Sequence, residues 1–245
     1  MSEPVYQHIL DKKKAGKKCL AVLIDPDKTE RLDFLLEHCN KAGVDFLLIG
    51  GSLLTNGSLD ACITAIRKKT AIPVVLFPGS VMQISAQADA LLLLSVISGR
   101  NPELLIGRHV MAAPLIRKSG LEVLPTGYML IESGRSTAAS YMSNTSPLPR
   151  HHNDIAACTA LAGEQLGMKM IYLEAGSGAQ ETVTTAMIEA VRQVLTVPLI
   201  TGGGIRTVEK AVENCKAGAD IIVVGNVLEE KPELVGTLAA AVHSF

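Results

Sequence analysis

Short apolar segments alternate with amphipathic ones along nearly the whole chain. The apolar runs are rich in Val, Ile and Leu and are too short for helices, which is typical of strands in a parallel sheet. Eight strands are predicted, at 19–24, 46–49, 74–77, 90–94, within 122–132, and at 170–174, 197–201 and 220–224. Between them apolar residues recur at helical spacing, as in Leu32, Leu35, Leu36 and Cys39 before Gly43, and in Val208, Ala211, Val212 and Cys215. This alternation predicts an α/β fold, a single (β/α)₈ TIM-type barrel in one domain over residues 1–245.

The connections predict where this barrel is irregular. Only residues 81–88 separate the third strand from the fourth, so helix 3 of the barrel is expected to be short, missing or displaced. Asp27 and Glu30 have the spacing of a capping box before the first barrel helix. Residues 133–149 are rich in Ser, Thr, Gly, Asn and Pro, which predicts a mobile loop that could act as a lid on the carboxyl face of the barrel.

Composition narrows the class of protein. Apolar residues make up 48% of the chain and aromatic ones only 3%, so the core must be built from aliphatic side chains. The net charge of −1 gives no reason to expect binding to nucleic acid. Contact with a membrane is expected to be peripheral at most. The basic run at 12–18 is interpreted as a solvated helix end. Five scattered cysteines and the absence of a signal-like N-terminus indicate free thiols in a cytoplasmic protein.

Glycines follow the last two predicted strands, at the end of the barrel where active sites form. Gly202, Gly203 and Gly204 end the seventh strand, and Gly225 with Asn226 ends the eighth. Main-chain amides can approach an anion closely where no Cβ intervenes, and these two loops are the usual phosphate site of such barrels. The alternative is that the glycines only form tight turns.

Polar residues follow three other strands. Asp25 and Ser52 would present hard oxygen ligands suited to Mg²⁺. The alternative is that Asp25 is a turn residue before Pro26. Tyr172 and Glu174 share one face of the sixth strand. A carboxylate inside a barrel is costly unless it has a partner, and its role would be to accept a proton or a hydrogen bond from a substrate hydroxyl. The alternative is an ion pair between Glu174 and Arg206 or a neighbouring lysine. The pair of histidines at 151–152 is interpreted as a solvated helix start.

These motifs, in this order, resemble those of the geranylgeranylglyceryl phosphate synthase family, which includes bacterial heptaprenylglyceryl phosphate synthases. The resemblance rests on segments 24–28, 50–52, 172–178, 202–206 and 225–226 and covers nearly the whole chain. It implies a Mg²⁺-dependent prenyltransferase that joins geranylgeranyl or another prenyl diphosphate to the C3 hydroxyl of sn-glycerol 1-phosphate in lipid biosynthesis. It also implies a modified barrel that assembles as a homo-oligomer, a dimer or a hexamer.

The resemblance also assigns roles to residues. Asp25 and Ser52 would bind Mg²⁺, and Glu174 would orient or deprotonate the acceptor hydroxyl. Glycerol 1-phosphate would be held by Tyr172, Leu173, Glu174, Ala175, Gly176, Ser177, Gly178, Gly203, Gly204, Gly225 and Asn226. The family often has Thr in place of Ser52, which keeps the hydroxyl. We place the prenyl tail in the gap left by the short third connection, beside residues 91–94.

Two other readings remain open from the sequence. One is a different phosphate-binding barrel enzyme, such as a phosphosugar isomerase or a thiamin-phosphate-synthase-like transferase. Isomerases of this kind usually pair a general acid with the base, and no convincing second group faces Glu174. The other is a non-catalytic barrel that binds phosphate or prenyl lipid, which would need neither Asp25 nor Glu174.

Overall fold

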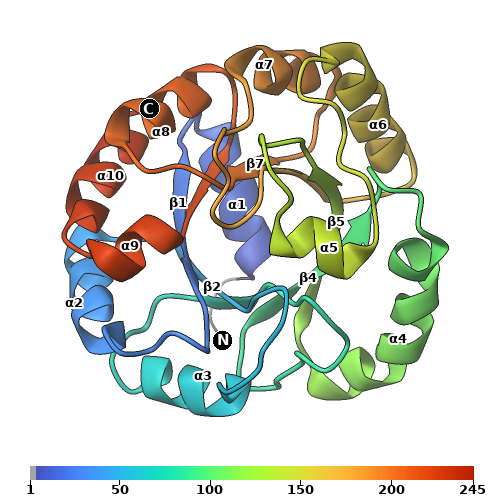
Figure 1. The fold of residues 1–245 in the computed structure, drawn as a ribbon. Helices are drawn as coiled ribbons and strands as arrows, with labels where there is room; N and C mark the ends of the chain where they lie inside the picture. Colours follow the sequence, from blue (N-terminus) through green and yellow to red (C-terminus); the bar gives the residue numbers. More distant parts are fainter. Residues whose placement is uncertain (1–3) are drawn as a thin grey trace.

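In the computed structural model, which describes residues 4–245, eight parallel strands close into a barrel (Figure 1). Each strand pairs with the next one in the chain, and the last pairs with the first. The strands are β1 (Cys19–Ile24), β2 (Phe46–Ile49), β3 (Val74–Leu76), β4 (Ala90–Val96), β5 (Glu122–Leu130), β6 (Met170–Glu174), β7 (Leu199–Gly202) and β8 (Ile221–Val224). The predicted fold class is therefore confirmed.

Helices surround this barrel as the periodicity predicted, with some additions. The ring consists of α2 (Leu32–Ala42), α3 (Leu59–Arg67), α4 (Arg108–Ser119), α6 (Asn153–Gln165), α7 (Thr185–Val194), α8 (Val208–Lys216) and α10 (Leu234–His243). Of α1 (Val5–Lys14) the sequence indicated only a helix end in the basic run, and it did not predict α5 (Ala138–Ser143) or α9 (Asn226–Glu230). Helix α4 is preceded by a π-helical turn, η1 (Glu103–Gly107), whose N-cap is Pro102.

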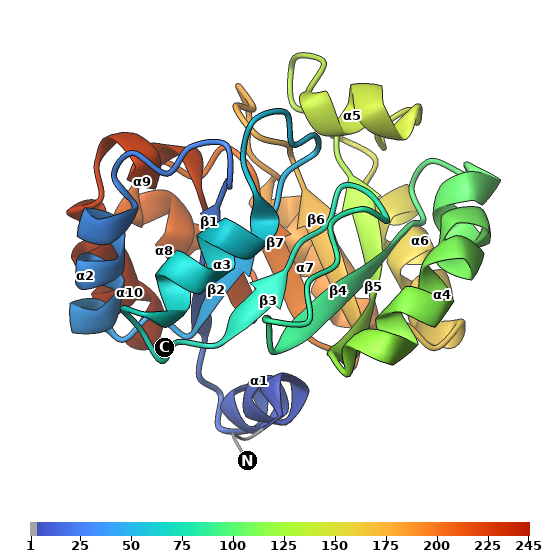
Figure 2. The ribbon, with the colours of Figure 1, turned by 90° about the horizontal axis from the view of Figure 1, so that it is seen from below.

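The connection between β3 and β4 contains no helix, as its length predicted. Figure 2 shows these two strands with only an extended connection in front of them, between α3 and α4. Because no helix covers the outer face of β3 and β4, this face is accessible to a ligand or to side chains of the flanking helices.

The side chains of the strands divide into two apolar layers. One fills the barrel and includes Phe46, Tyr128 and Tyr172. The other lies between the strands and the helices and includes Leu36 and Leu173. Because successive side chains of a strand point to opposite faces, Tyr172 and Glu174 point inward while Leu173 points outward.

The basic run near the N-terminus has a different environment from the predicted solvated helix end. Helix α1 lies across the amino end of the barrel, opposite to α5 (Figure 2). There Lys12 lies 3.2 Å from the buried carboxylate of Asp45, and Lys13 lies 3.4 Å from the buried carboxylate of Asp220. The lysines close the lower end of the barrel by pairing with acidic side chains at its rim.

Asp27 does not form the predicted capping box. Helix α2 begins only at Leu32, and its N-cap Arg31 makes no side-chain capping bond. The Asp27 carboxylate instead accepts hydrogen bonds from the amides of Thr55, Asn56 and Gly57 in the loop after β2. These hydrogen bonds lower the pKa of Asp27 to about 2, and the bond from the Thr55 amide has the largest effect. Asp27 thus ties the loops after β1 and β2 together.

None of the five thiols forms a disulfide, and four of them are buried. Cys19, Cys39, Cys62 and Cys215 are buried and unpaired, whereas Cys158 is exposed. Burial raises the pKa of Cys39 to about 12, so this thiol is protonated and unreactive near neutral pH. Within residues 4–245 no helix is both long and apolar enough to cross a bilayer.

We expect Asp220→Ala to lower the free energy of unfolding on the order of 3 kcal/mol, because a buried carboxylate that neutralises several cations is lost. The Asp220 carboxylate lies 3.0 Å from Arg192 and accepts a hydrogen bond of 2.9 Å from the Leu199 amide, in addition to its contact with Lys13. Urea unfolding of the variant measures this loss.

Asp33→Ala is the matched control, since Asp33 pairs with Lys69 on the exposed face of α2. Its effect should stay within about 0.5 kcal/mol. Equal losses in the two variants would contradict the structural role of Asp220.

Candidate active site

The carboxyl ends of the strands enclose a cavity at the mouth of the barrel, which we call the mouth cavity. The chain brings most of the predicted site residues to it, from five different strands. They are Asp25, Ser52, Tyr172, Glu174, Ser177, Gly178, Gly203, Gly204, Gly225 and Asn226. Asp25 and Glu174 therefore face a single cavity, although they are far apart in the sequence.

Glu174 is the buried acidic group of this cavity. It is only 5% exposed, and its Oε1 accepts a hydrogen bond of 2.6 Å from the Gly176 amide. Burial raises the pKa of Glu174, while that hydrogen bond opposes the change. The alternative ion pair with Arg206 does not form, because the Arg206 guanidinium donates to the carbonyl of Ala179 at 2.8 Å. The carboxylate is thus available to a ligand.

Aromatic rings form the floor beneath Glu174. Tyr172 stacks on Phe77 with centroids 5.5 Å apart, and it meets the edge of Tyr128 at 5.3 Å. The hydroxyl of Tyr172 has no hydrogen bond of regular geometry, yet it lies near Glu174. Burial, with the nearby Glu174 carboxylate, raises the pKa of both Tyr128 and Tyr172 well above the ordinary value. Both phenols therefore remain neutral donors beside the carboxylate.

The main chain at Gly203 passes directly over this carboxylate. Gly203 has φ +83°, and a Cβ at this position would lie 2.4 Å from Oε1 of Glu174. No other residue type fits both the left-handed backbone and the close approach. The glycine after β7 is therefore required by contact with Glu174, beyond the tight turn that the alternative reading assumed.

Beside Glu174, the loops after β6, β7 and β8 form a pocket with few side chains. Gly203 and Gly204 line one side of it and Gly225 and Asn226 the other. Ser177 closes it from the β6 loop through a hydrogen bond of 3.0 Å to Oδ1 of Asn226. A pocket bounded by main chain and by neutral polar side chains is suited to an anion such as a phosphate.

Asp25 and Ser52 line the mouth cavity from the loops after β1 and β2. Oδ1 of Asp25 accepts a hydrogen bond of 3.0 Å from the Asp27 amide, while Oδ2 is 4.0 Å from the ammonium group of Lys28. Within residues 4–245 no group of three or more His, Cys, Asp or Glu side chains has the arrangement of a metal site. Mg²⁺ commonly uses only one or two protein carboxylates together with water and substrate phosphate, so these two oxygen-bearing side chains fit such an ion.

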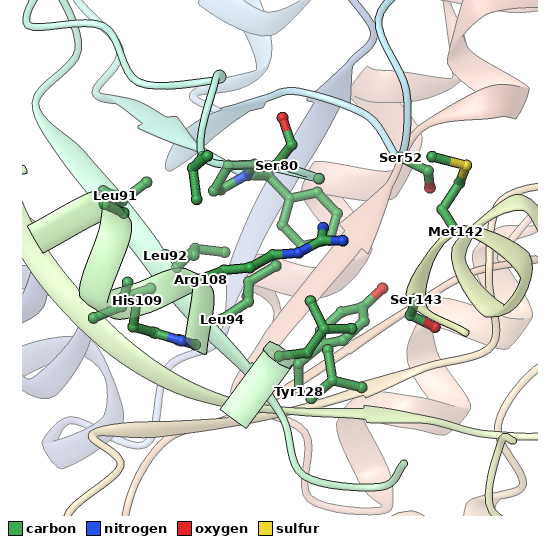
Figure 3. Close-up of a pocket in the computed structure, with 18 of the residues that line it drawn as sticks. Ser52, Ser80, Leu91, Leu92, Leu94, Arg108, His109, Tyr128, Met142 and Ser143 are labelled. Atoms are coloured by element: carbon green, nitrogen blue, oxygen red, sulfur yellow. The ribbon is translucent and has the colours of Figure 1, made fainter. Parts of the chain in front are cut away.

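A second, apolar cavity opens from the mouth cavity toward α4, and we call it the side cavity. Ser52, Phe77 and Tyr128 line both cavities. The side cavity continues along β4 beneath α4, where its lining is mostly aliphatic: Val81, Ile84, Leu91, Leu92, Leu93, Leu94, Val96, Leu104, Ala112 and Ile116. Figure 3 shows this cavity, with Ser52, Tyr128, Met142 and Ser143 on one side and Leu91 and His109 on the other. It lies where the helix of the third connection is missing.

His109 adds a polar group to the side cavity without adding charge. Its Nε2 lies 3.2 Å from Oγ of Ser95. Burial lowers the pKa of His109, so the ring is neutral near pH 7. The side cavity therefore remains suited to a hydrocarbon.

The segment 133–149, predicted as a mobile loop, contains the short helix α5, which Figure 2 places above the mouth of the barrel. Ala138 and Ala139 line the mouth cavity, and Thr137 packs against Gly176. Arg135 donates a hydrogen bond to the carbonyl of Gly178. The segment thus covers the cavity and is attached to the β6 loop.

Some predicted residues do not line the mouth cavity. The side chains of Leu173 and Ala175 pack outward among the helices, and Gly176 contributes the amide that holds Glu174. Conversely, no sequence pattern had indicated a role for Phe77, Tyr128, Arg108 or His109. Pro125 obscures the boundaries of β5. Only the alternation of inward-facing side chains along this strand, Thr126 and then Tyr128, could have indicated that Tyr128 faces the barrel interior.

Comparison with known proteins decides the family. A sequence profile of the PcrB family matches residues 13–242. The chain belongs to the PcrB family. Within it, the chain is 54% identical to the geranylgeranylglyceryl phosphate synthase of Chitinophaga pinensis over 100% of its length and 98% of that protein. It is 42% identical to the synthase of the same name from Pyrococcus abyssi, over 92% of this chain and 90% of that one.

A solved structure is also similar to this chain. The (S)-3-O-geranylgeranylglyceryl phosphate synthase of Thermoplasma acidophilum, crystallised with sn-glycerol-1-phosphate, superimposes with a TM-score of 0.92 at 31% identity over 100% of both chains. The identification from the sequence motifs as a member of this synthase family is therefore confirmed.

We expect Glu174→Gln to stabilise this PcrB family protein increasingly as pH rises. The raised pKa means that the folded state holds its proton where the unfolded chain has lost it, so ionisation of Glu174 costs stability above the ordinary value of 4.5. Below that value both states are protonated and the cost vanishes. The stability difference between variant and wild type, measured by urea unfolding from pH 4 to pH 8, should grow with pH. A difference that stays constant or shrinks would show that the carboxylate is not destabilised by its burial.

Proposed function

We propose that the chain transfers a geranylgeranyl or other prenyl group from its diphosphate to the C3 hydroxyl of sn-glycerol 1-phosphate, forming an ether-linked prenylglyceryl phosphate. The observation that carries this proposal is one buried carboxylate, Glu174, set between a main-chain anion pocket and an apolar cavity. The names of the relatives and the ligand in the Thermoplasma acidophilum crystal support it.

The acceptor would bind through its phosphate in the pocket of Gly203, Gly204, Gly225 and Asn226. Glycerol phosphate is short, so its far hydroxyl would then reach Glu174. Because burial raises the affinity of Glu174 for a proton, its carboxylate is a better acceptor for the hydroxyl proton than an exposed glutamate. Tyr172, a neutral donor beside it, would help to orient the hydroxyl.

The donor would place its diphosphate beside Asp25 and Ser52 and its tail in the side cavity. Asp25 and Ser52 would hold Mg²⁺, which when bound stabilises the negative charge that gathers on the departing diphosphate. The chain itself would position the substrates, because it aligns the hydroxyl at Glu174 with the first carbon of the donor. The two substrates would then react as if they were parts of one molecule, which lowers the entropic cost of the reaction. The aromatic floor and α5 would exclude water, which could otherwise capture an incipient allylic cation.

We also propose that the chain is cytoplasmic and forms a homo-oligomer. Four buried thiols without partners support a reducing compartment. The outer side of η1 and α4 exposes Ile106, Val110, Met111 and Leu115, each by more than half of its surface. Apolar side chains that gather in this way favour contact with a second copy.

The most direct test incubates the protein with labelled sn-glycerol 1-phosphate, Mg²⁺ and prenyl diphosphates of graded length. We expect a labelled lipid that is extractable into organic solvent and that resists alkaline hydrolysis, because it is an ether. Binding of both substrates without product would favour the non-catalytic barrel. Failure to bind the prenyl diphosphates would favour another phosphate-binding enzyme.

We expect Glu174→Gln and Asp25→Asn each to lower kcat by about 100-fold or more, the usual contribution of a general base or of a metal-held leaving group. Steady-state kinetics with both substrates at saturation measures this loss. Glu189→Gln serves as control, since Glu189 is exposed on α7 away from both cavities. Turnover retained in the Glu174 and Asp25 variants would contradict the proposed roles.

We expect Ala112→Trp to shift the preferred donor toward shorter tails. Ala112 lines the side cavity from α4, so an indole at this position would occupy space that the tail needs. Ala113→Trp provides the control on the same helix, because Ala113 faces outward. Competition between donors of two lengths measures the preference. An unchanged preference in the Ala112 variant would place the tail elsewhere.

A further inference from the structure

Among the described residues that line the side cavity, Arg108 is the one that brings a charge, and a hydrocarbon does not require it. Arg108 is the first residue of α4 and lies one turn before Ala112, which itself lies one turn before Ile116. All three line the side cavity, so one face of α4 presents a cation followed by two apolar residues. Since side chains on a helix lean toward its N-terminus, Arg108 reaches toward the barrel mouth.

Arg108 has no partner in the part of the chain that the structure describes. No hydrogen bond or ion pair among residues 4–245 involves its guanidinium. Glu103, the acidic residue nearest in sequence, instead lies against Gly107. Figure 3 shows the Arg108 side chain extending across the side cavity, with its guanidinium toward the side where Ser52 and Ser143 lie. A half-buried guanidinium carries five N–H donors. Because no acceptor of the described chain reaches them, we expect a ligand to supply an acceptor.

The charges of the mouth cavity indicate what that ligand is. The carboxylates of Asp25, Glu174 and Glu229 line it, and Arg206, already bonded to Ala179, is the cation among its described lining residues. Two phosphate-bearing substrates would add several further negative charges. Lys28, just outside this lining, already pairs with Glu229 at 2.9 Å. The mouth therefore has no cation free of protein partners among its described lining residues, and Arg108 lies at the border where the diphosphate of a donor with its tail in the side cavity would lie.

We propose that Arg108 binds the diphosphate of the prenyl donor from the tail side, across from Asp25 and Ser52. A guanidinium can donate two parallel hydrogen bonds to phosphate oxygens. Such bonds would fix the donor lengthwise, with its tail below the arginine and its reacting carbon facing Glu174. Arg108 would also stabilise the diphosphate as it leaves. This role rests on the proposed prenyl transfer.

Kinetics of Arg108→Gln, with Arg117→Gln as control, test the assignment. Arg117 lies on the same helix but is exposed and outside both cavities. We expect Arg108→Gln to raise the KM for geranylgeranyl diphosphate and the inhibition constant of inorganic pyrophosphate about tenfold or more, as loss of a charge-assisted pair would. The KM for sn-glycerol 1-phosphate should stay within about twofold, since that substrate does not reach Arg108. Arg117→Gln should match wild type throughout.

Arg108→Lys keeps the positive charge but loses the planar guanidinium that can donate two parallel hydrogen bonds. The inhibition constant of pyrophosphate for this variant should therefore lie between those of wild type and Arg108→Gln. If the glutamine variant folds poorly, this lysine variant decides: weaker inhibition by pyrophosphate with an unchanged acceptor KM supports the role. Pyrophosphate inhibition and donor KM equal to those of wild type in the variants would overturn it. If wild-type protein binds neither pyrophosphate nor prenyl diphosphate, the proposed function fails instead.

Discussion

The site depends on one costly arrangement, a carboxylate buried at the end of a barrel strand without a cationic partner. Glu174 is held by the Gly176 amide and covered by the main chain of Gly203. A side chain at Gly203 would exclude the carboxylate, and an ion pair with Arg206 would neutralise its basicity. The fold avoids both, because Gly203 leaves room for the carboxylate and Ala179 engages Arg206. In the proposed reaction, the same burial that costs stability would make the Glu174 carboxylate a better acceptor for the proton of a substrate hydroxyl.

A second constraint comes from an element that the chain lacks. A helix after β3 would cover the outer face of β3 and β4, as helices do elsewhere around the barrel (Figure 1). In its place an extended connection leaves an aliphatic cavity that α4 closes and that joins the mouth beside Ser52. Omission of one helix thus provides space for a long hydrocarbon next to the polar mouth, without disturbing the closed ring of strands on which the geometry of Glu174 depends.

The barrel and most of the mouth were predictable from the sequence because they follow from local patterns. Strand periodicity and the glycines after β7 and β8 are local, and the carboxyl ends of parallel strands necessarily meet. The missing third helix was also predictable, since connection length is a local quantity. Asp27 was misjudged for the opposite reason. Its capping spacing competes with three amides of the loop after β2, and only the pairing of β1 with β2 brings that loop close.

Other features escaped prediction because they depend on contacts between distant segments. The lysines of α1 resemble a solvated helix end until the barrel places Asp45 and Asp220 beneath them. Tyr128 and Phe77 form the floor of the mouth cavity only because the closed barrel brings their rings together with that of Tyr172. Arg108 resembles any surface arginine in sequence, and its position at the head of α4 over an uncovered strand distinguishes it.

A single barrel mouth brings together an anion pocket, the Glu174 carboxylate and an apolar cavity. A crystal structure with sn-glycerol 1-phosphate and an unreactive thio analogue of a prenyl diphosphate tests this most directly. We predict the glycerol phosphate against Gly203 and Asn226, its free hydroxyl at Glu174, and the tail beneath α4. A phosphate bound away from Gly203 and Asn226, or a tail that leaves the mouth by another route, would contradict the account.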